Sequence, residues 1–402
     1  MVMPGINSAP VTIVGAGPVG LFAAILLTRA GHRVLVLEKN DGLAMDMRAS
    51  TFHPATLDLL HEAGLAEPLI FRGSIGQGWQ YMIHGTKQHA VFDLAIISDA
   101  TAHPFRLLCE QFHLSNIAVE QLVRNPLFEI RFGQEVLQTK NLPDGVALTV
   151  RSSGGEKTIN SQWLIAADGG QSAVRQQLGL GFEGESLPKA SITVVLNHSF
   201  QNDIPGLLGI NYVWTETGHY GLTQIRDLWR FSYSPHPDQG VEEALSEAAV
   251  QDRIQSVFPH QKPYELLQIN HYSLNQRCLA SFRHGRVLFA GDSAHLESPA
   301  GGMGMNAGLH DAHCLAEHLV PVLEGASDQL LDRYSRRRRT IALEETQRLS
   351  SRNYYWHRET RPGERQAIWQ GLQDILSSEE KTRDFLLESS MVHSRQREKE
   401  IE

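Results

Sequence analysis

Apolar residues near the start of the chain form two short runs around a longer stretch of helix-forming residues. Residues 11–14 are apolar and mostly β-branched, too few for a helix, and they predict a buried parallel strand. Residues 19–30 are rich in Leu, Ala, Ile and Phe and predict a helix, which Gly31 ends before a second strand at 33–37. This order predicts a βαβ unit.

Strand-like runs continue through the middle of the chain. They occupy residues 128–131, 146–150, 163–167 and 191–196, and polar or glycine-containing turns separate them. Residues 212–233 then carry aromatic side chains along alternating strands and lead into a Ser-Pro-His-Pro turn. We interpret this region as part of a second domain, built on a sheet.

The last third of the chain turns mostly to helices. A helical spacing relates Val241, Ala244, Leu245 and Ala248, and residues 286–290 predict one more buried strand before a glycine-rich segment. From residue 330 onward the chain is predicted to be mostly helical and increasingly charged. We interpret the basic run at 336–339 as a solvated helix face and not as a nuclear localisation signal.

Length and charge limit the class of protein. A chain of 402 residues exceeds the roughly 250 to 300 residues at which a single core stops growing, so we expect two closely packed domains. The 36 basic and 45 acidic residues give a formal net charge of -9. Such an acidic excess repels a phosphate backbone, so nucleic acid is not expected as a partner.

Cysteine usage and the N-terminal residues bear on the location of the protein. The three cysteines, Cys109, Cys278 and Cys314, are far apart and form no Cys-x-x-Cys pair, so we predict neither disulfides nor a metal site. The first residues contain no basic segment of a signal peptide, and glycines and a proline interrupt the apolar run that follows. We therefore expect a cytoplasmic protein without a membrane span.

The first chemical motif is a Gly-x-Gly-x-x-Gly turn between the first predicted strand and helix. In it, Gly15 permits a tight turn, Gly17 lets the backbone approach a pyrophosphate, and Gly20 lets the helix and strand pack closely. The helix N-terminus favours an anion. At the end of the second strand, Glu38 suits the two ribose hydroxyls of an adenosine and would repel a 2′-phosphate, which favours FAD or NAD over NADP.

Two more motifs follow predicted strands. Residues 163–170 end in Asp168-Gly-Gly, a pattern that is common in ordinary turns and weak by itself. Residues 285–295 contain Gly-Asp-Ser-Ala-His, in which Asp292 can hydrogen-bond a polyol chain. The glycine-rich segment 299–306 then leads into a helix whose exposed N–H groups can bind an acceptor-rich ring and stabilise negative charge on it, as on a reduced flavin.

With the three motifs in this order, the sequence resembles the class A flavoprotein monooxygenases, the family of para-hydroxybenzoate hydroxylase, across residues 11–320. The resemblance implies an α/β fold with a discontinuous Rossmann-type FAD-binding domain of the GR2 type at 1–75, 105–180 and 278–330. This domain is interleaved with a mixed β-sheet substrate domain at 76–104 and 181–277, and a C-terminal helical region occupies 331–402.

The resemblance assigns FAD contacts residue by residue. Among them, Arg48 matches the family's arginine that reaches the pyrophosphate and helps the flavin move, a task that suits a bidentate guanidinium. For a further contact before the next helix, His113 is the alternative to Gln111. The implied cofactor-binding residues are Gly15, Gly17, Pro18, Gly20, Glu38, Lys39, Arg48, Gln111, Asp168, Asp292, Gly304, Met305 and Asn306.

The substrate side is less defined. The implied catalytic residues are His53, which lies near the ring in related sequences, Pro299, and a base from His219 or Tyr220 that takes a phenolic proton. The family commonly shows two prolines after Ala-His and two intervening residues, but Glu297-Ser298-Pro299 keeps only the second, so the wall beside the flavin is expected to differ in shape or charge. Because strand neighbours face opposite sides, at most half of the following pocket candidates can line one cavity: Tyr212, Trp214, His219, Tyr220, Arg226 and Trp229.

By this resemblance the protein is a monooxygenase without a metal. NADH or NADPH would reduce FAD, O2 would add at flavin C4a, and the hydroperoxide would hydroxylate a small aromatic or heteroaromatic substrate. The alternatives are an FAD-dependent reductase of the geranylgeranyl reductase type and an FAD-binding module without turnover; a halogenase is disfavoured because no Trp-x-Trp-x-Ile-Pro segment occurs. The sequence does not indicate the substrate, the choice of NADH or NADPH, or the oligomeric state.

Overall fold

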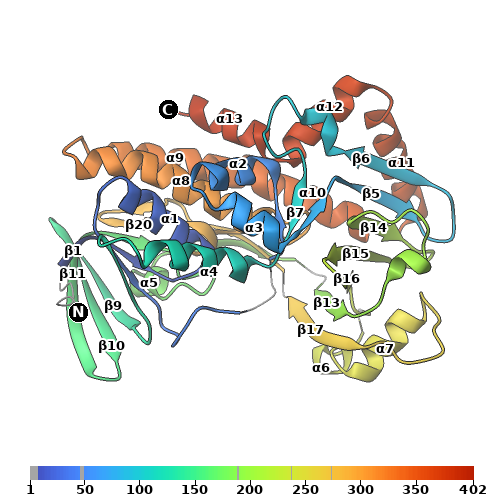
Figure 1. Cartoon of the computed structure of the whole chain (residues 1–402), viewed down its shortest axis with the longest axis horizontal. Helices are drawn as coiled ribbons and strands as arrows, with labels where there is room; N and C mark the ends of the chain where they lie inside the picture. Colours follow the sequence, from blue (N-terminus) through green and yellow to red (C-terminus); the bar gives the residue numbers. More distant parts are fainter. Residues whose placement is uncertain (1–7, 46–48, 188–189, 237, 273) are drawn as a thin grey trace.

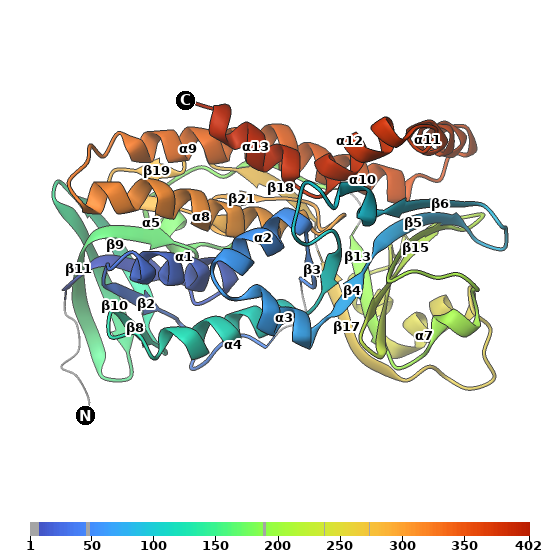
Figure 2. The same ribbon diagram turned by 45° about the horizontal axis from the view of Figure 1, so that its top comes forward.

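Two large β-sheets lie toward opposite ends of the molecule, and helices from the last third of the chain run between them (Figure 1). The structure is a computed structural model that describes residues 8–45, 49–187, 190–236, 238–272 and 274–402. The turned view in Figure 2 shows the C-terminal helices as one layer that extends over both sheets.

The first sheet is built around the N-terminal strand. β1 pairs in parallel with β2 on one side and with β11 on the other, so the chain crosses over on both sides of it. The strands, in spatial order, are β19 (Arg283–His284), β20 (Val287–Phe289), β11 (Gly155–Ala166), β1 (Ser8–Val14), β2 (Val34–Leu37) and β8 (Phe128–Arg131), and β10 (Gly145–Ser152) and β9 (Glu135–Leu142) extend β11 as an antiparallel hairpin.

Helices cover this sheet because its strands are apolar on both faces. All four residues of β2 are buried, as expected for a parallel strand between covering layers. One helix, α1 (Pro18–Arg29), lies between α4 (Gln111–Leu122) and α8 (Met303–Leu323), and α9 (Leu330–Ile341) packs on α8. The short α5 (Ala173–Gln177) lies against β9.

The second sheet takes strands from two distant parts of the chain. In spatial order they are β17 (Leu266–Tyr272), β13 (Ser191–Leu196), β16 (Leu228–Tyr233), β15 (His219–Ile225), β14 (Ile210–Trp214), β5 (Gly78–Ile83) and β6 (His89–Asp93). One face packs on α6 (Val241–Ala244) and α7 (Glu247–Gln255), and aromatic residues of the other face pack on α11 (Pro362–Ile375) and α12 (Glu379–Ser389).

Two small sheets connect these layers. One contains β3 (Thr51–Phe52), β7 (Arg106–Leu108) and β4 (Ser74–Gly76), and the other contains β12 (Glu183–Ser186), β18 (Asn275–Cys278) and β21 (His295–Leu296). The remaining helices are α2 (Pro54–Glu62), α3 (Ala66–Arg72), α10 (Gln347–Arg358) and α13 (Val392–Glu400), with 3-10 turns η1 (Leu94–Ile97), η2 (Phe200–Asn202) and η3 (Gly291–Ser293) and a π turn η4 (Ala342–Thr346).

The predicted α/β class is confirmed, and the predicted βαβ unit forms as β1, α1 and β2. The helix predicted around residues 241–248 divides into α6 and α7, because the Ser246 hydroxyl accepts the Ala249 N–H and starts a new helix. The limits of the domains stay a prediction. Among the described residues, none of the helices combines the length and apolar character that a membrane span requires.

The interpretation of residues 336–339 as a solvated face is wrong. These residues lie in α9, where Arg336 is exposed but Arg338 has 0% relative exposure. Its guanidinium forms ion pairs with Asp311 on α8 and Glu398 on α13. A basic run read by itself cannot show this, because both acidic partners come from other helices.

Candidate functional site

The glycine turn between β1 and α1 is shaped by close backbone contacts. The φ of Gly15 is 104°, and a Cβ at this residue would lie 2.3 Å from the Ala167 carbonyl oxygen. A Cβ on Gly20 would lie 2.2 Å from the Gly15 carbonyl oxygen. By contrast, a Cβ on Gly17, the N-cap of α1, would meet no atom within 4 Å, and no side chain caps the helix. The first N–H groups of α1 therefore have the space and the polarity to bind an anion.

The Glu38 carboxylate stands beside this turn. Its Oε2 accepts a hydrogen bond from the Ala16 N–H at 2.9 Å, and its Oε1 accepts two from Asn40, from the backbone N–H at 3.0 Å and from Nδ2 at 2.7 Å. The side chain is half-buried, and the neighbouring Lys39 is exposed. Because a carboxylate oxygen can accept two hydrogen bonds, Oε2 retains capacity for a hydroxyl donor such as one of a ribose.

The second motif begins α5. The Asp168 Oδ2 accepts the Val174 N–H at 3.1 Å, while its Oδ1 is buried without a hydrogen-bond partner in the described part of the chain. Burial raises the pKa of this carboxyl group above its ordinary value. The structure therefore gives Asp168 a helix-capping role, and it leaves one buried oxygen that a polar ligand could satisfy.

Arg175 links the second motif to the third, a role that its sequence position did not reveal. Its Nη2 donates to the Gly170 carbonyl at 2.6 Å and its Nη1 donates to the Ser293 carbonyl at 3.0 Å. Its guanidinium carbon lies 3.8 Å from the centre of the Phe182 ring. Two turns that are more than 100 residues apart in the sequence are thereby joined by one side chain.

The third motif packs directly against the first. The φ of Gly291 is 65°, and Asp292 beside it is exposed in η3. A Cβ on Gly308 of α8 would lie 2.7 Å from Val19 Cγ2 and 3.0 Å from Gly291 Cα. Only a glycine lets α1, η3 and α8 approach this closely, so the N-terminal regions of α1 and α8 lie at the same edge of the sheet.

The start of α8 presents backbone, not side chains. Its N-cap, Gly302, has a φ of 70° and provides no side-chain cap. The amide of Asn306 faces inward, where its Nδ2 donates to the Thr51 carbonyl at 2.8 Å and its Oδ1 accepts the His53 N–H at 3.0 Å. The N–H groups of Gly304 and Met305 in the first turn have no partner within the helix, so they remain available to a ligand, as the sequence predicted for a flavin ring.

His53 is neutral and has a defined tautomer. Its Nε2 lies 2.8 Å from the Gly301 carbonyl oxygen, which can only accept, so Nε2 carries the proton. The Nδ1 atom is buried without a partner among the described residues. Burial, together with the positive charge of Arg106, lowers the pKa of His53 to about 3. His53 is therefore a hydrogen-bond acceptor at neutral pH and a poor general base.

The two predicted base candidates point in opposite directions. The hydroxyl of Tyr220 lies 2.8 Å from His84 Nδ1, and its ring packs with Phe231 and Phe258 on the face that α6 and α7 cover. His219 pairs with Trp214 on the other face, where the Trp214 indole N–H donates to the carbonyl of Trp356 on α10. This leaves Tyr220 outside any site near α8.

The other predicted residues are spread around the site. Pro299 is exposed, and its carbonyl accepts the Gly302 N–H at 3.0 Å, just before α8. Gln111 is the first residue of α4, and its N–H donates to the Ala49 carbonyl at 2.9 Å. The neighbour of Ala49, Arg48, lies outside the described residues. Of the remaining pocket candidates, Trp229 lies on the face toward α7 and Arg226 is exposed in a turn.

Arg106 on β7 is a buried cation that sequence reasoning missed. Its guanidinium carbon lies 3.9 Å from the centre of the Trp79 ring, and its Nε has no partner among the described residues. Its Nη2 donates to the Ser389 carbonyl at 3.4 Å, and no carboxylate pairs with it within the described residues. Tyr212, within hydrogen-bond reach of Arg106, stacks on His357 with ring centres 3.7 Å apart. Polar and aromatic side chains thus gather between the second sheet and the start of α8.

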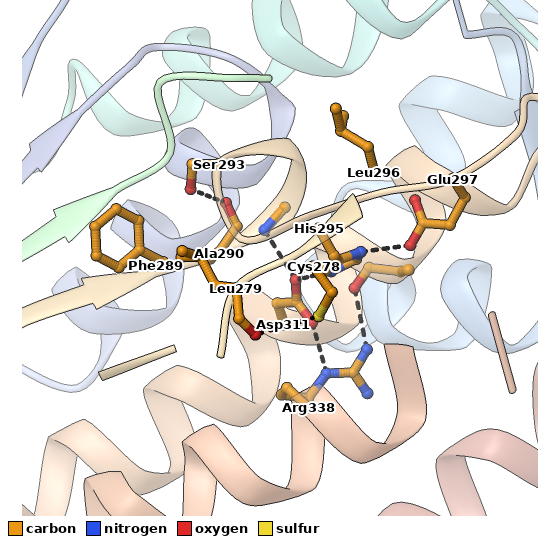
Figure 3. Close-up of polar contacts among 12 residues, drawn as sticks. Cys278, Leu279, Phe289, Ala290, Ser293, His295, Leu296, Glu297, Asp311 and Arg338 are labelled. Carbon is orange, nitrogen blue, oxygen red and sulfur yellow. Dashed lines mark hydrogen bonds and ion pairs between the residues drawn. The ribbon is translucent and has the colours of Figure 1, made fainter. Parts of the chain in front are cut away.

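A chain of buried charges lies behind the start of α8, and Figure 3 shows four of its members, Glu297, His295, Asp311 and Arg338. His295 Nε2 lies 2.7 Å from Asp311 Oδ2, and His295 Nδ1 hydrogen-bonds the Glu297 carboxylate. The Asp311 Oδ1 accepts Arg338 Nε at 2.6 Å, and Arg338 continues to Glu398. Because Asp311 Oδ2 also accepts the Gly291 N–H at 2.8 Å, the chain holds the turn that carries Asp292.

Comparisons with known proteins agree with this geometry. A family model described as an FAD binding domain matches residues 8–349. The para-nitrophenol 4-monooxygenase of Pseudomonas sp. strain WBC-3 is 34% identical over 365 residues, which cover 88% of this chain and 89% of that protein.

Solved structures extend the comparison. The crystal structure of p-nitrophenol 4-monooxygenase from Pseudomonas putida superposes with a TM-score of 0.89 at 32% identity, covering 96% of this chain and 99% of that one. A ternary complex of aklavinone-11 hydroxylase with FAD and aklavinone superposes with a TM-score of 0.77 at 26% identity, covering 87% of this chain and 69% of that one. The chain therefore belongs to the class A family of FAD-dependent aromatic hydroxylases, and it is an FAD-dependent monooxygenase.

Proposed function

We propose that this protein uses NADH or NADPH together with O2 to hydroxylate a small phenol-type aromatic substrate. One observation carries the proposal. The first N–H groups of two uncapped helices, α1 and α8, lie at one edge of the sheet, and the Glu38 carboxylate flanks the first of them. This arrangement matches a ligand with an adenosine, a pyrophosphate and an acceptor-rich ring, as FAD has.

In the proposed site, each part of FAD meets groups of matching chemistry. Glu38 would accept the ribose hydroxyls, and the backbone from Gly15 to Gly20 would hold the pyrophosphate. The exposed carboxylate of Asp292 would accept hydroxyls of the ribityl chain. The backbone N–H groups of Gly304 and Met305 would bind the edge of the ring on which negative charge develops. Pro18, Lys39, Arg48, Gln111, Asp168 and Asn306 complete the proposed set.

When bound, FAD supplies the reaction with hydride acceptance from a nicotinamide and with activation of O2. The protein supplies the surroundings for this chemistry. Backbone donors at the start of α8 stabilise negative charge, and the layer of buried aromatic residues between the second sheet, α10 and α12 excludes water. The proposed catalytic residues act by orientation: Nδ1 of His53, which has no partner among the described residues, would accept a hydrogen bond from a ligand, and Pro299 shapes the entry to α8.

Arg106 and Tyr212 support a substrate that carries a negatively charged or strongly polar oxygen. A buried guanidinium without a carboxylate partner is costly unless a ligand compensates it. A phenolate or nitro oxygen next to Arg106 would provide this compensation, and the para-nitrophenol 4-monooxygenases among the relatives act on a compound with both groups. His219, on the same face of the sheet, stays a proposed base for the phenolic proton.

The proposed setting is the cytoplasm. The three cysteines are free and buried, which agrees with a reducing compartment. The formal net charge of -9 also agrees with small-molecule partners in place of nucleic acid.

The test is a turnover assay on the purified protein with its FAD. NADH and NADPH are supplied separately with para-nitrophenol and with panels of phenolic, aminoaromatic and heteroaromatic acids. We expect one nicotinamide and one aromatic compound to give oxygen uptake equal to hydroxylated product, with an 18O label from 18O2 in that product. Double-bond reduction without oxygen uptake would show a reductase. A flavin that neither NADH nor NADPH bleaches would show a binding module.

A further inference from the structure

Glu297 points a buried carboxylate at the first turn of α8. Its side chain is 1% exposed, although it lies two residues before the exposed Pro299. One oxygen, Oε1, hydrogen-bonds His295 Nδ1. The other, Oε2, lies 3.2 Å from the position that a Cβ on Gly304 would take. A negative charge is therefore held within a few ångströms of the backbone that the proposed site assigns to the flavin ring (Figure 3).

His295 carries a positive charge for a geometric reason. Each of its two ring nitrogens hydrogen-bonds a carboxylate, Nδ1 to Glu297 and Nε2 to Asp311. An ionised carboxylate can only accept, so both nitrogens carry protons and the ring is an imidazolium. Burial by itself would lower the pKa of His295, but the two carboxylates outweigh it and hold that pKa well above its usual range. Phe282 stacks on the ring at an interplanar angle of 11°, which fixes its plane.

The five charges alternate in sign along the chain. From the first turn of α8 they run Glu297, His295, Asp311, Arg338 and Glu398. Asp311 is shared between two cations and Glu398 is paired with Arg338, so the sum is one negative charge. The charge nearest the start of α8 is the Glu297 carboxylate, and the imidazolium stands directly behind it.

We propose that Glu297 and His295 are positioning residues of opposite sign that set the reduction potential of FAD, Glu297 lowering it and His295 raising it. This inference rests on the proposed function, because it requires the flavin ring at the first turn of α8. The physical reason is that reduction adds negative charge to the ring, and interactions between charges are strong in a buried region of low dielectric constant. The hydrogen bond between the two side chains holds both charges in fixed places.

Two variants of the holoenzyme test the signs. In Glu297→Gln the amide keeps the size of the side chain and removes its charge, and we expect the midpoint potential of bound FAD to rise. In His295→Gln the imidazolium is lost, and we expect the potential to fall. The expected size in each case is about a tenfold change in the ratio of reduced to oxidised FAD at a fixed potential, which is about 30 mV for a two-electron couple. The measurement is a spectroscopic titration against reference dyes, without substrate.

A structural role would give a different pattern. If the pair only maintained the fold, both variants would move the potential in the same direction or leave it unchanged, and that result overturns the inference. Glu297→Asp keeps the charge and should return the potential close to that of the unchanged protein. Glu324→Gln, which removes an exposed carboxylate from the far end of α8, should leave it unchanged.

Failure of the inference and failure of the proposed function have different readouts. The dissociation constant of FAD, measured by adding FAD to the apoprotein, tests the cofactor site itself. Absence of FAD binding by the unchanged protein would overturn the proposed function. FAD binding with potentials that do not move in opposite directions would overturn only the inference. If His295→Gln does not fold, the rise in Glu297→Gln and its reversal in Glu297→Asp decide the question.

Discussion

The two helix N-termini of the proposed FAD site are built in different ways. The start of α1 is shaped by glycines whose missing side chains allow backbone to pass within about 2 to 3 Å of where a Cβ would lie, and the Glu38 carboxylate lies beside it. The start of α8 is supported by five buried charges from α8, α9, α13 and the segment before α8. The first is a steric device, and its glycines can be recognised from neighbouring residues in the sequence. The second is an electrostatic device that exists only when distant segments meet.

The largest expected effect comes from breaking the electrostatic device at its centre. Arg338→Met leaves the buried Glu398 without its cation and Asp311 with His295 alone, so we expect a loss of about 3 to 5 kcal/mol in the free energy of unfolding and a weaker affinity for FAD. Denaturant unfolding of the apoprotein measures the first effect. The matched control is Arg336→Met, two residues earlier on the exposed side of α9, which should change stability by about 0.5 kcal/mol or less.

The steric device predicts a contrast between two glycines of the same turn. Gly15→Ala forces a Cβ to 2.3 Å from a carbonyl oxygen at a positive φ, so we expect a loss of about 3 kcal/mol in apoprotein stability together with loss of FAD binding. Gly17→Ala meets no atom within 4 Å, so the apoprotein should keep its stability while FAD binding weakens by about tenfold or more. Equal FAD affinity in Gly17→Ala and the unchanged protein would contradict a pyrophosphate at this turn.

Arg106 extends the comparison to the substrate side, where a buried cation has no carboxylate partner among the described residues. Arg106→Met should lower kcat/KM by about tenfold to a hundredfold, because a charged hydrogen bond to the substrate oxygen is worth about 1.5 to 3 kcal/mol. The same change should leave the melting temperature unchanged or raise it, because it removes a buried cation without a carboxylate partner in the described chain. Arg226→Met, at an exposed turn, is the control. A stability loss with unchanged kinetics would assign Arg106 a structural role.

The last prediction concerns how the free energy of unfolding changes with pH, and it depends on His53. Its pKa is lowered to about 3 in the folded protein, while the unfolded chain has the ordinary value near 6.5, so the unfolded state binds the proton first as pH falls. Its stability contribution is complete above pH 6.5 and is lost between about pH 6.5 and 3, at up to about 1.4 kcal/mol per pH unit.

The variant His53→Gln should therefore show a shallower loss of stability across this window. The comparison is with the unchanged protein under the same conditions. Unfolding free energies at several pH values between 4 and 7 give the slopes. Identical slopes in the unchanged protein and His53→Gln would show that His53 is not the group that titrates.

Several elements could be predicted because their signals are local. The βαβ unit, the strands at 128–131 and 191–196, and the three turns that follow strands depend on apolar periodicity and on glycine conformations that neighbouring residues set. The opposite faces of His219 and Tyr220 also follow from the strand period of two. Which of these two side chains points toward α8 depends on where α6 and α7 dock, and the strand pattern does not contain that information.

The sequence by itself determined the class of fold, the glycine turn and the carboxylate of Glu38 beside it, because these features depend on residues at most a βαβ unit apart. Only the tertiary structure decided the charge states: a neutral His53, a charged His295, a buried Arg338, and an Arg106 that has no carboxylate partner among the described residues. The physical reason is that protonation and ion pairing depend on burial and on partners such as Asp311 and Glu398, which lie 27 and 60 residues from Arg338. The identity of a side chain is written in the sequence, whereas its electrostatic surroundings arise only when the chain has folded.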